Sequence, residues 1–367
     1  MNRDTDYIRL SATPKIGSIG FSSLIRQFRG DAGEAISWLE REKGIKAPSK
    51  SYAEAQLKKA EHCGAHLVLS CDKDYPPMLL QTEDRPPFLW VLGDVAALGA
   101  RMVGVVGSRN ASLNARNFAG LLSRQISAAG FSIASGMAIG IDTAAHNGAL
   151  DADNGKTVAV LAGGADILYP PSNRALYERL KSTKGCAVVS DMPLGTDPAA
   201  KLFVRRNRIV AGMSEGVIIA EASLRSGSLT TARFAADYSR DVFAVPNFPL
   251  DPRAHGCNDL IKNGAALCDG SQEVIDALGP SAPIRPPEPE FKLMEASPGG
   301  PSSRGPTPVP EEIKHQVLEN LSSEPISVNS LLRAMPEFSQ ASISAAILEL
   351  EITGRLVHTD SGLVLVL

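Results

Sequence analysis

The stretch RMVGVVGSRNASLNARNFAGLLSRQISAAGFSIAS, residues 101–135, decides the fold class. Its apolar, β-branched run at 101–108 is typical of a buried strand, and 115–130 has the apolar spacing of a helix that stops at a glycine. A second strand is predicted at 131–136. A strand, a helix and a strand over this distance predict a βαβ unit, whose two strands lie parallel in one sheet.

The same alternation continues downstream of this stretch. Further helices are predicted at 138–150, 172–182 and 225–239, between apolar runs that end in small residues. Because these runs are continuously apolar, they indicate strands covered on both faces, as in a mostly parallel sheet. The predicted strands are KTVAVLAGG (156–164), GCAVVSDM (185–192), GVIIAEA (216–222) and DVFAVP (241–246).

The chain divides into four predicted segments. Residues 1–70 are mainly helical, and KIGSIG at 15–20 resembles the turn of a helix-hairpin-helix; a plain helical bundle is the favoured interpretation there. Residues 71–280 carry the α/β pattern. Residues 281–310 are dominated by proline, glycine and serine, which indicates a linker. Residues 311–367 contain three helical segments and a hairpin, the order of a winged helix, for which a protein partner is favoured over DNA.

Composition excludes several classes of protein. The net charge of the 367 residues is −3, so a nucleic-acid function needs a local basic patch. The five cysteines form no CxxC pair, which favours a reducing compartment over a disulfide framework or a zinc site. The sequence has no apolar run near the ~18 residues of a membrane span. A cytoplasmic protein without metal, cofactor or membrane contact is predicted.

Small residues and arginines gather where the predicted strands end. The carboxyl ends of parallel strands share one edge of a sheet, and helix N-termini there present free N–H groups to anions. FVRRNRIVAGMSEGVIIAEA (203–222) adds arginines directly before one of the strands. Several such loops with several arginines suit a run of phosphates, as in single-stranded nucleic acid. The predicted contact residues are Gly107, Ser108, Arg109, Ser135, Gly136, Gly163, Gly164, Arg205, Arg206, Asn207, Arg208, Ser226, Gly227, Ser228, Thr230 and Thr231.

Enzyme signatures are incomplete. VGVVGSRN lacks the GxGxxG spacing, and Gly155-Lys156-Thr157 precedes a strand where a P-loop would follow one. A GxSxG match centred on Ser214 also precedes a strand, so it does not fit a nucleophile elbow. Asp142 and His146 share a helix face but have no third ligand nearby. No catalytic residue is therefore predicted.

Five motifs in series resemble the DNA-processing protein A (DprA/Smf) family. They are GSRNAS, SGMAIGIDTAAHNGAL, VAVLAGGADILYPPSN, VRRNRIVAGMSEGVIIAEA and SGSLTTARFAADYSRDVFAVP, and the resemblance extends from about residue 74 to 266. Two positions depart from the family pattern: Val204 stands where proline is common, and Asn247 where glycine is common.

The resemblance implies an extended Rossmann-like domain flanked by variable domains, which fit the helical N-terminus and the winged helix. It implies a homodimer that binds single-stranded DNA and loads the RecA recombinase during natural transformation, without catalysis. Carried over by position, the site includes Ser108, Arg109, the strand-end glycines, 205–208 and 226–231.

An alternative interpretation is a nucleotide-processing enzyme resembling the cytokinin-activating phosphoribohydrolases. Such enzymes have a glycine and threonine loop before a helix, as at 226–231, together with a carboxylate that acts on the ribose. SGSLTTARF contains no acid, and Glu221 is the only near candidate.

Overall fold

The structure of the chain is a computed structural model, which describes residues 3–279, 310–321, 328–359 and 362–365. It falls into two units, one formed by 1–54 with 289–367 and the other by 55–288, and each is treated separately below. The predicted linker at 281–310 lies outside the described residues, apart from Pro310.

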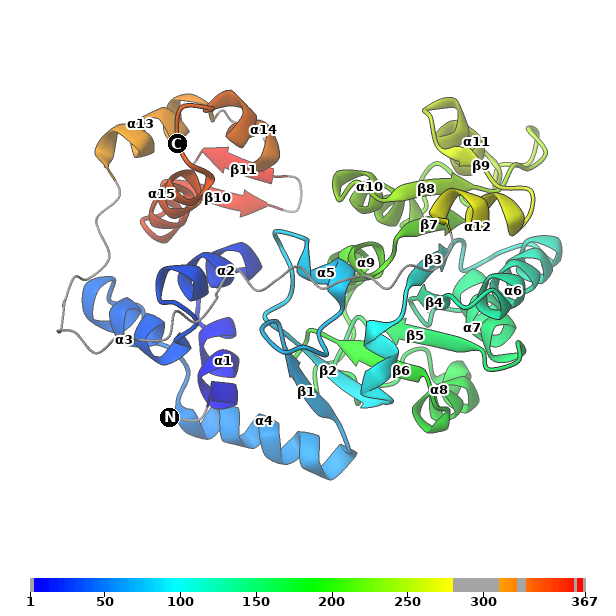
Figure 1. Ribbon diagram of the computed structural model, residues 1–367, viewed down its shortest axis with the longest axis horizontal. Coiled ribbons are helices and arrows are strands. Elements are labelled where there is room, and N and C mark those ends of the chain that lie inside the picture. Colours follow the sequence, from blue (N-terminus) through cyan, green and yellow to red (C-terminus); the bar gives the residue numbers. More distant parts are fainter. Residues whose placement is uncertain (1–2, 280–309, 322–327, 360–361, 366–367) are drawn as a thin grey trace. The chain divides into compact units, whose positions relative to one another are not determined.

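A nine-stranded sheet forms the centre of the 55–288 unit (Figure 1). Its strand order is β1-β2-β6-β5-β4-β3-β7-β8-β9, and all neighbours from β6 to β9 pair in parallel. The mostly parallel α/β fold expected from residues 101–135 is confirmed. The strands are β1 (His66–Leu69), β2 (Phe88–Gly93), β3 (Met102–Val106), β4 (Ser132–Ser135), β5 (Lys156–Val160), β6 (Cys186–Ser190), β7 (Gly216–Ile219), β8 (Asp241–Ala244) and β9 (Ala266–Leu267).

An antiparallel pair extends the sheet beyond β6. β1 pairs with β2, with Leu67 opposite Trp90, and β2 pairs with β6. Residues 66–69 belong to the predicted N-terminal helical segment, whereas the structure places them in this sheet. Four residues after a helix are too short a run to show a strand period, so only the pairing with β2 reveals them.

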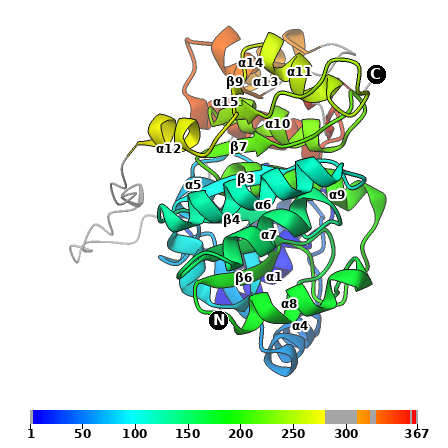
Figure 2. The same ribbon diagram turned by 90° about the vertical axis from the view of Figure 1, so that its right-hand side faces the viewer.

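Helices cover both faces of the sheet. Figure 2 shows α6, α7 and α8 side by side over one face, where Ile126 and Ile133 join the same buried cluster. On the other face, Ile209 of α9 and Val217 of β7 belong to a second buried cluster. The helices of this unit are α5 (Pro77–Leu80), α6 (Leu113–Ala128), α7 (Ile141–Leu150), α8 (Arg174–Ser182), α9 (Ala200–Met213), α10 (Ser228–Asp237), α11 (His255–Lys262) and α12 (Gln272–Leu278), with 3-10 turns η1 (Val95–Gly99) and η2 (Pro171–Asn173).

The other unit contains the N-terminal helices and the C-terminal winged helix. Asp31 caps α3 by accepting a hydrogen bond from the Glu34 amide at 2.9 Å, and the rings of Tyr7 and Phe21 meet edge to face. Three helices and a two-stranded hairpin confirm the winged-helix order. The elements are α1 (Arg3–Ser11), α2 (Ser18–Gln27), α3 (Ala32–Glu42), α13 (Glu311–Glu319), α14 (Val328–Ala334), α15 (Gln340–Ile352), β10 (Leu356–Thr359) and β11 (Gly362–Leu365), while α4 (Lys50–Cys63) spans the boundary between the units.

Among the described helices, none is both long enough and apolar enough to cross a bilayer.

Candidate nucleic-acid interface

Six loops follow the parallel strands β3 to β8 and lie at one edge of the sheet, because parallel strands end on the same side. We call this set of loops the rim. The rim consists of residues 107–112, 136–140, 161–170, 191–199, 220–227 and 245–254.

The loop after β3 is held by a buried glutamate from β7's end. The Glu221 side chain is buried, and its carboxylate accepts hydrogen bonds from the Ser112 hydroxyl at 2.7 Å and the Ser112 amide at 3.1 Å. The Glu221 carbonyl accepts from the Ser108 amide at 2.8 Å. Ser112 in turn caps α6 by accepting from the Ala115 amide. These contacts fix the loop from below and leave Arg109 and Asn110 exposed on it.

Two glycines let this loop lie against the loop after β4. A Cβ on Gly107 would come within 2.7 Å of Ile141, and one on Gly140 within 2.4 Å of the Ser108 carbonyl. Gly140 also has a φ of +84°, which L side chains rarely adopt. The neighbouring rim loops are therefore in backbone contact.

The arginine segment 205–208 lies inside α9, which begins at Ala200, and its three arginines have different environments. Arg206 is buried, and its guanidinium donates to the carbonyls of Gly136 and Val160, at the ends of β4 and β5. Burial lowers the pKa of Arg206 to about 10, and the nearby Asp142 carboxylate partly opposes that shift. Arg206 thus ties two rim loops together from within the protein.

Arg208 is also buried, and it pairs with Asp191 at the end of β6. Its guanidinium lies 2.8 Å from the Asp191 carboxylate and also donates to the Asp84 carbonyl. Arg205 reaches the same Asp191 oxygen at 3.2 Å, but its side chain remains 47% exposed. All three arginines are among the predicted contact residues, but only Arg205 is presented to solvent.

The structure divides the sixteen predicted contact residues into two groups of eight. The first group is exposed or half-buried and consists of Gly107, Ser108, Arg109, Arg205, Asn207, Ser226, Gly227 and Thr230. The second group is buried and consists of Ser135, Gly136, Gly163, Gly164, Arg206, Arg208, Ser228 and Thr231.

The buried group is occupied by contacts within the protein. The Ser135 hydroxyl donates to the Val105 carbonyl at 2.6 Å. The Gly164 amide donates to the Thr196 carbonyl at 2.8 Å, and a Cβ on Gly163 would lie 2.7 Å from that same oxygen. The loop after β6 therefore covers the two glycines after β5, and the Gly164 amide is occupied within the protein.

The half-buried part of the 226–231 loop is joined to α9. The Asn207 side-chain amide donates to the Gly227 carbonyl at 3.1 Å, and the hydroxyls of Ser226 and Ser228 lie 2.7 Å apart. These contacts place the exposed Gly227 and the Arg205-bearing turn of α9 beside one another.

Aromatic rings lie directly beside the exposed Arg109. Its guanidinium carbon lies 4.6 Å from the centre of the Phe203 ring, within the range of a cation–π contact. Tyr169 contacts Phe203 edge to face, with ring centres 5.6 Å apart, and is 44% exposed. Tyr169 is placed beside Phe203 by the loop after β5, and no local sequence pattern shows this pairing.

Exposed apolar side chains also gather on the rim. Ile139, Leu224, Phe248 and Leu250 are each at least 47% exposed, and each belongs to a loop that follows a parallel strand. Single-stranded nucleic acid offers base faces, which pack on apolar side chains, and phosphates, which pair with cations. The rim carries side chains of both kinds.

Other candidate catalytic groups are occupied in structural contacts. The Ser214 hydroxyl is buried and donates to the Val210 carbonyl at 2.7 Å. His146 is buried with Nδ1 2.7 Å from the Thr157 hydroxyl, and burial lowers the pKa of His146 to about 3, so its ring is neutral. Burial raises the pKa of Asp142 on the same helix. Within the described parts of the chain, no three or more His, Cys, Asp or Glu side chains cluster as metal ligands would.

Comparison with known proteins identifies two regions of this chain, the α/β region and the winged helix. A sequence model of the DNA recombination-mediator protein A family matches residues 66–279, and a model of the DprA winged helix domain matches 301–362. Protein Smf of Synechocystis is 34% identical over 317 residues, which cover 80% of this chain and 77% of that protein. DNA processing protein DprA of Streptococcus pneumoniae is 40% identical over 209 residues, covering 56% of this chain and 71% of that protein.

Two solved structures share the fold. The structure of DprA from S. pneumoniae matches with a TM-score of 0.64 and 31% identity, over 73% of this chain and 96% of that one. DNA processing protein A from Helicobacter pylori matches with a TM-score of 0.52 and 28% identity, over 59% of this chain and 96% of that one. The H. pylori structure is described as giving insight into a single-stranded DNA binding mode.

Proposed function

Because the chain belongs to the DNA recombination-mediator protein A family, we propose that it binds single-stranded DNA along the rim. The observation that carries this proposal is the cluster of Arg109, Phe203 and Tyr169, three residues from separate elements. It joins an exposed cation to two aromatic rings, which is the pairing that single strands need for phosphates and bases.

The roles follow from exposure. Arg109 and Arg205 are exposed and contact phosphates, while Phe203 and Tyr169 offer ring faces or edges to bases. Arg206 acts from within, because its hydrogen bonds to the ends of β4 and β5 hold the rim loops in place. Stacking and phosphate contacts do not depend on the hydrogen-bonding edges of the bases, so binding is sequence-independent. Because stacking needs bases that are free of a duplex, single strands are preferred over duplex.

Binding of a labelled oligothymidylate over a salt series tests this assignment. Arg109→Ala is expected to weaken binding by about tenfold or more and to lower the magnitude of the log–log salt slope by about 0.7. Lys73→Ala, an exposed cation near β1, is the control and is expected to bind as the parent does. If Arg109→Ala and Arg205→Ala both bind as the parent does, the assignment of the rim as the DNA-binding site is refuted.

We also propose that the protein is a homodimer in the cytoplasm that delivers the bound strand to the RecA recombinase. The supporting observation is the family membership together with the resemblance of its five motifs. Assembly of RecA on a single strand coated with single-strand binding protein is expected to be faster with this protein present. Unchanged assembly, at concentrations that saturate the strand, would exclude the delivery role.

The alternative of a nucleotide-processing enzyme is disfavoured by the position of Glu221. Both of its carboxylate oxygens accept hydrogen bonds from Ser112, and the side chain is buried under the loop after β3. Incubation with nucleoside monophosphates is expected to release no free base.

A further inference from the structure

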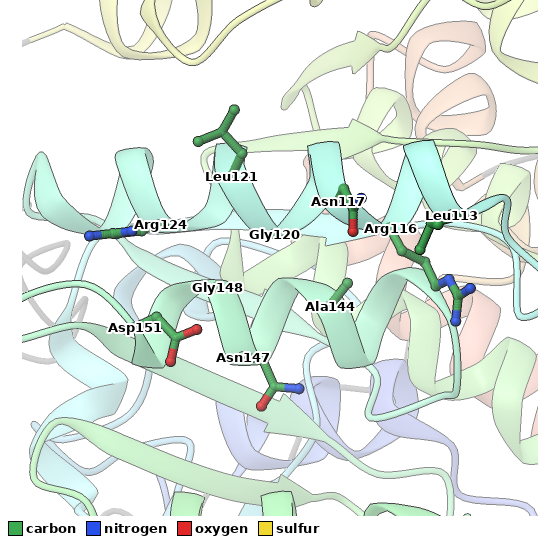
Figure 3. Close-up of a pocket in the computed structure, with 10 residues that line it drawn as sticks. All are labelled: Leu113, Arg116, Asn117, Gly120, Leu121, Arg124, Ala144, Asn147, Gly148 and Asp151. Atoms are coloured by element: carbon green, nitrogen blue, oxygen red, sulfur yellow. The ribbon is translucent and has the colours of Figure 1, made fainter.

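A shallow groove runs between α6 and α7, on the face of the sheet that these helices cover (Figure 3). Leu113 and Arg116 lie at the end of the groove where α6 begins, and Arg124 and Asp151 lie toward its other end. The groove is lined by Leu113, Arg116, Asn117, Gly120, Leu121, Arg124, Ala144, Asn147, Gly148 and Asp151.

Two glycines set the depth of the groove. A Cβ on Gly148 would lie 2.1 Å from the Gly120 carbonyl, so the backbones of α6 and α7 are in direct contact at this point. Ala144, one turn before Gly148 on α7, is another small residue of the lining. A small-residue floor between longer side chains produces an open channel along the helix pair.

The walls of the channel carry cations and apolar groups. Arg116 and Arg124 are exposed, and neither side chain has a hydrogen bond or ion pair within the part of the chain that the structure describes. Leu113 and Leu121 are 63% and 50% exposed. The one carboxylate of the lining, that of Asp151, lies 3.5 Å from Arg179.

The channel is continuous with the rim. α6 begins at Leu113, directly after the loop that carries Arg109 and ends in the capping Ser112. Arg116 lies in the first turn of that helix, and Arg124 lies eight residues further, about 12 Å along the axis. The two guanidinium groups are therefore far enough apart to meet separate phosphates.

From this continuity and charge, we propose that a single strand leaving the rim at Arg109 continues along the α6–α7 groove. The proposal rests on the proposed function of the rim. Arg116 and Arg124 contact phosphates, Leu113 and Leu121 contact base faces, and Asn117 and Asn147 offer amide groups to base edges. A helical protein partner would need a continuous apolar stripe, whereas here each leucine is followed by an arginine three residues later.

Oligothymidylates of two lengths separate the groove from the rim. One of about 6 nucleotides is short enough to occupy the rim alone, and one of about 20 can also enter the groove. Arg116→Glu with Arg124→Glu is expected to leave the short oligonucleotide's affinity unchanged. The same double variant is expected to weaken the long one about tenfold and to lower the magnitude of its salt slope by about 1.4.

A matched control keeps the total charge change the same. Lys58→Glu with Lys73→Glu changes two exposed cations on the segments that flank β1, and it is expected to bind both oligonucleotides as the parent does. An equal loss of affinity for the long oligonucleotide in this control would show a general effect of charge and would refute the proposed binding in the groove.

Three further results would overturn the proposal. They are parent-like binding of the long oligonucleotide by the Arg116/Arg124 variant, no gain in affinity with length in the parent, and a change in oligomeric state in that variant without DNA. Arg109→Ala distinguishes failure of the rim. If Arg109→Ala and Arg205→Ala both bind the short oligonucleotide as well as the parent does, the rim assignment fails, whatever the length series shows.

Discussion

Replacement of Arg206 by methionine tests whether this arginine supports the rim from inside the protein. The change keeps an unbranched side chain and removes the guanidinium, which donates to the Gly136 and Val160 carbonyls. Leaving a buried acceptor without its donor costs about 1–3 kcal/mol, so two acceptors give about 2–6 kcal/mol. Loss of the buried charge returns part of its desolvation cost, and we expect a net destabilisation of about 3 kcal/mol.

The assay is denaturant unfolding followed by tryptophan fluorescence. The chain has two tryptophans; Trp90 is fully buried in β2 of the sheet, and Trp38 lies in α3 of the other unit. A Trp38→Phe background therefore makes the signal report the sheet unit alone in the full chain. Arg109→Met is the matched control, and because Arg109 is exposed, its unfolding free energy is expected to change by less than about 0.5 kcal/mol.

The two arginines should separate stability from binding. Arg109→Met is expected to lose DNA affinity at parental stability, and Arg206→Met is expected to lose stability first. If Arg206→Met unfolds at the parental denaturant midpoint and yet loses as much DNA affinity as Arg109→Met, Arg206 contacts DNA and its structural role is refuted.

Three more changes have defined outcomes. Gly136→Ala places a Cβ 2.3 Å from the Arg206 guanidinium, so a loss of about 2 kcal/mol is expected in the same melts; that loss should shrink in the Arg206→Met background. His146→Asn should flatten the pH dependence of stability. The pKa of His146 is about 3 in the folded protein and 6.5 for the unperturbed side chain, so the unfolded chain binds more protons between these values. Stability therefore falls by up to about 1.4 kcal/mol per pH unit as the pH drops through this range; equal slopes in parent and variant would contradict this. Phe203→Ala should weaken single-strand binding by about 1–3 kcal/mol with an unchanged salt slope, and a slope reduced as far as in Arg109→Ala would contradict a stacking role.

The alternation of strands and helices could be predicted because each central strand is a continuous apolar run that ends in small residues. Residues 102–106 and 216–219 are examples, and both form central strands. The edge pair β1 and β2 could not be predicted in this way, since four residues such as 66–69 become a strand only through a partner far along the chain. Local pattern thus determined the centre of the sheet, and tertiary pairing determined its edge.

The sequence predicted where the site lies in the fold, but it did not predict which side chains face solvent there. The loops after β3 and β7 lie on the rim as expected, but the direction of each arginine depends on partners that the local sequence does not show. Arg208 donates a hydrogen bond to the Asp84 carbonyl, 124 residues away in the sequence, and Arg206 donates to the Gly136 carbonyl, 70 residues away. Similarly, 163–164 resemble an anion loop until the segment at 193–198 is seen to cover them.

The burial of Arg206 and Arg208 changes how the protein's charge must be counted. An arginine-rich segment in a chain of net charge −3 resembles a concentrated anion site, yet only Arg205 of its three arginines is exposed. The two exposed arginines assigned to phosphates above, Arg109 on the rim and Arg205 beside it on α9, would give a salt slope near −1.4, whereas a strand that also contacts Arg116 and Arg124 would give one near −2.8. The slope for a long oligonucleotide therefore counts how many arginines contact DNA, and a slope steeper than that of four contacts would mean that the other exposed arginines of the rim, Arg225 and Arg253, contact the strand as well.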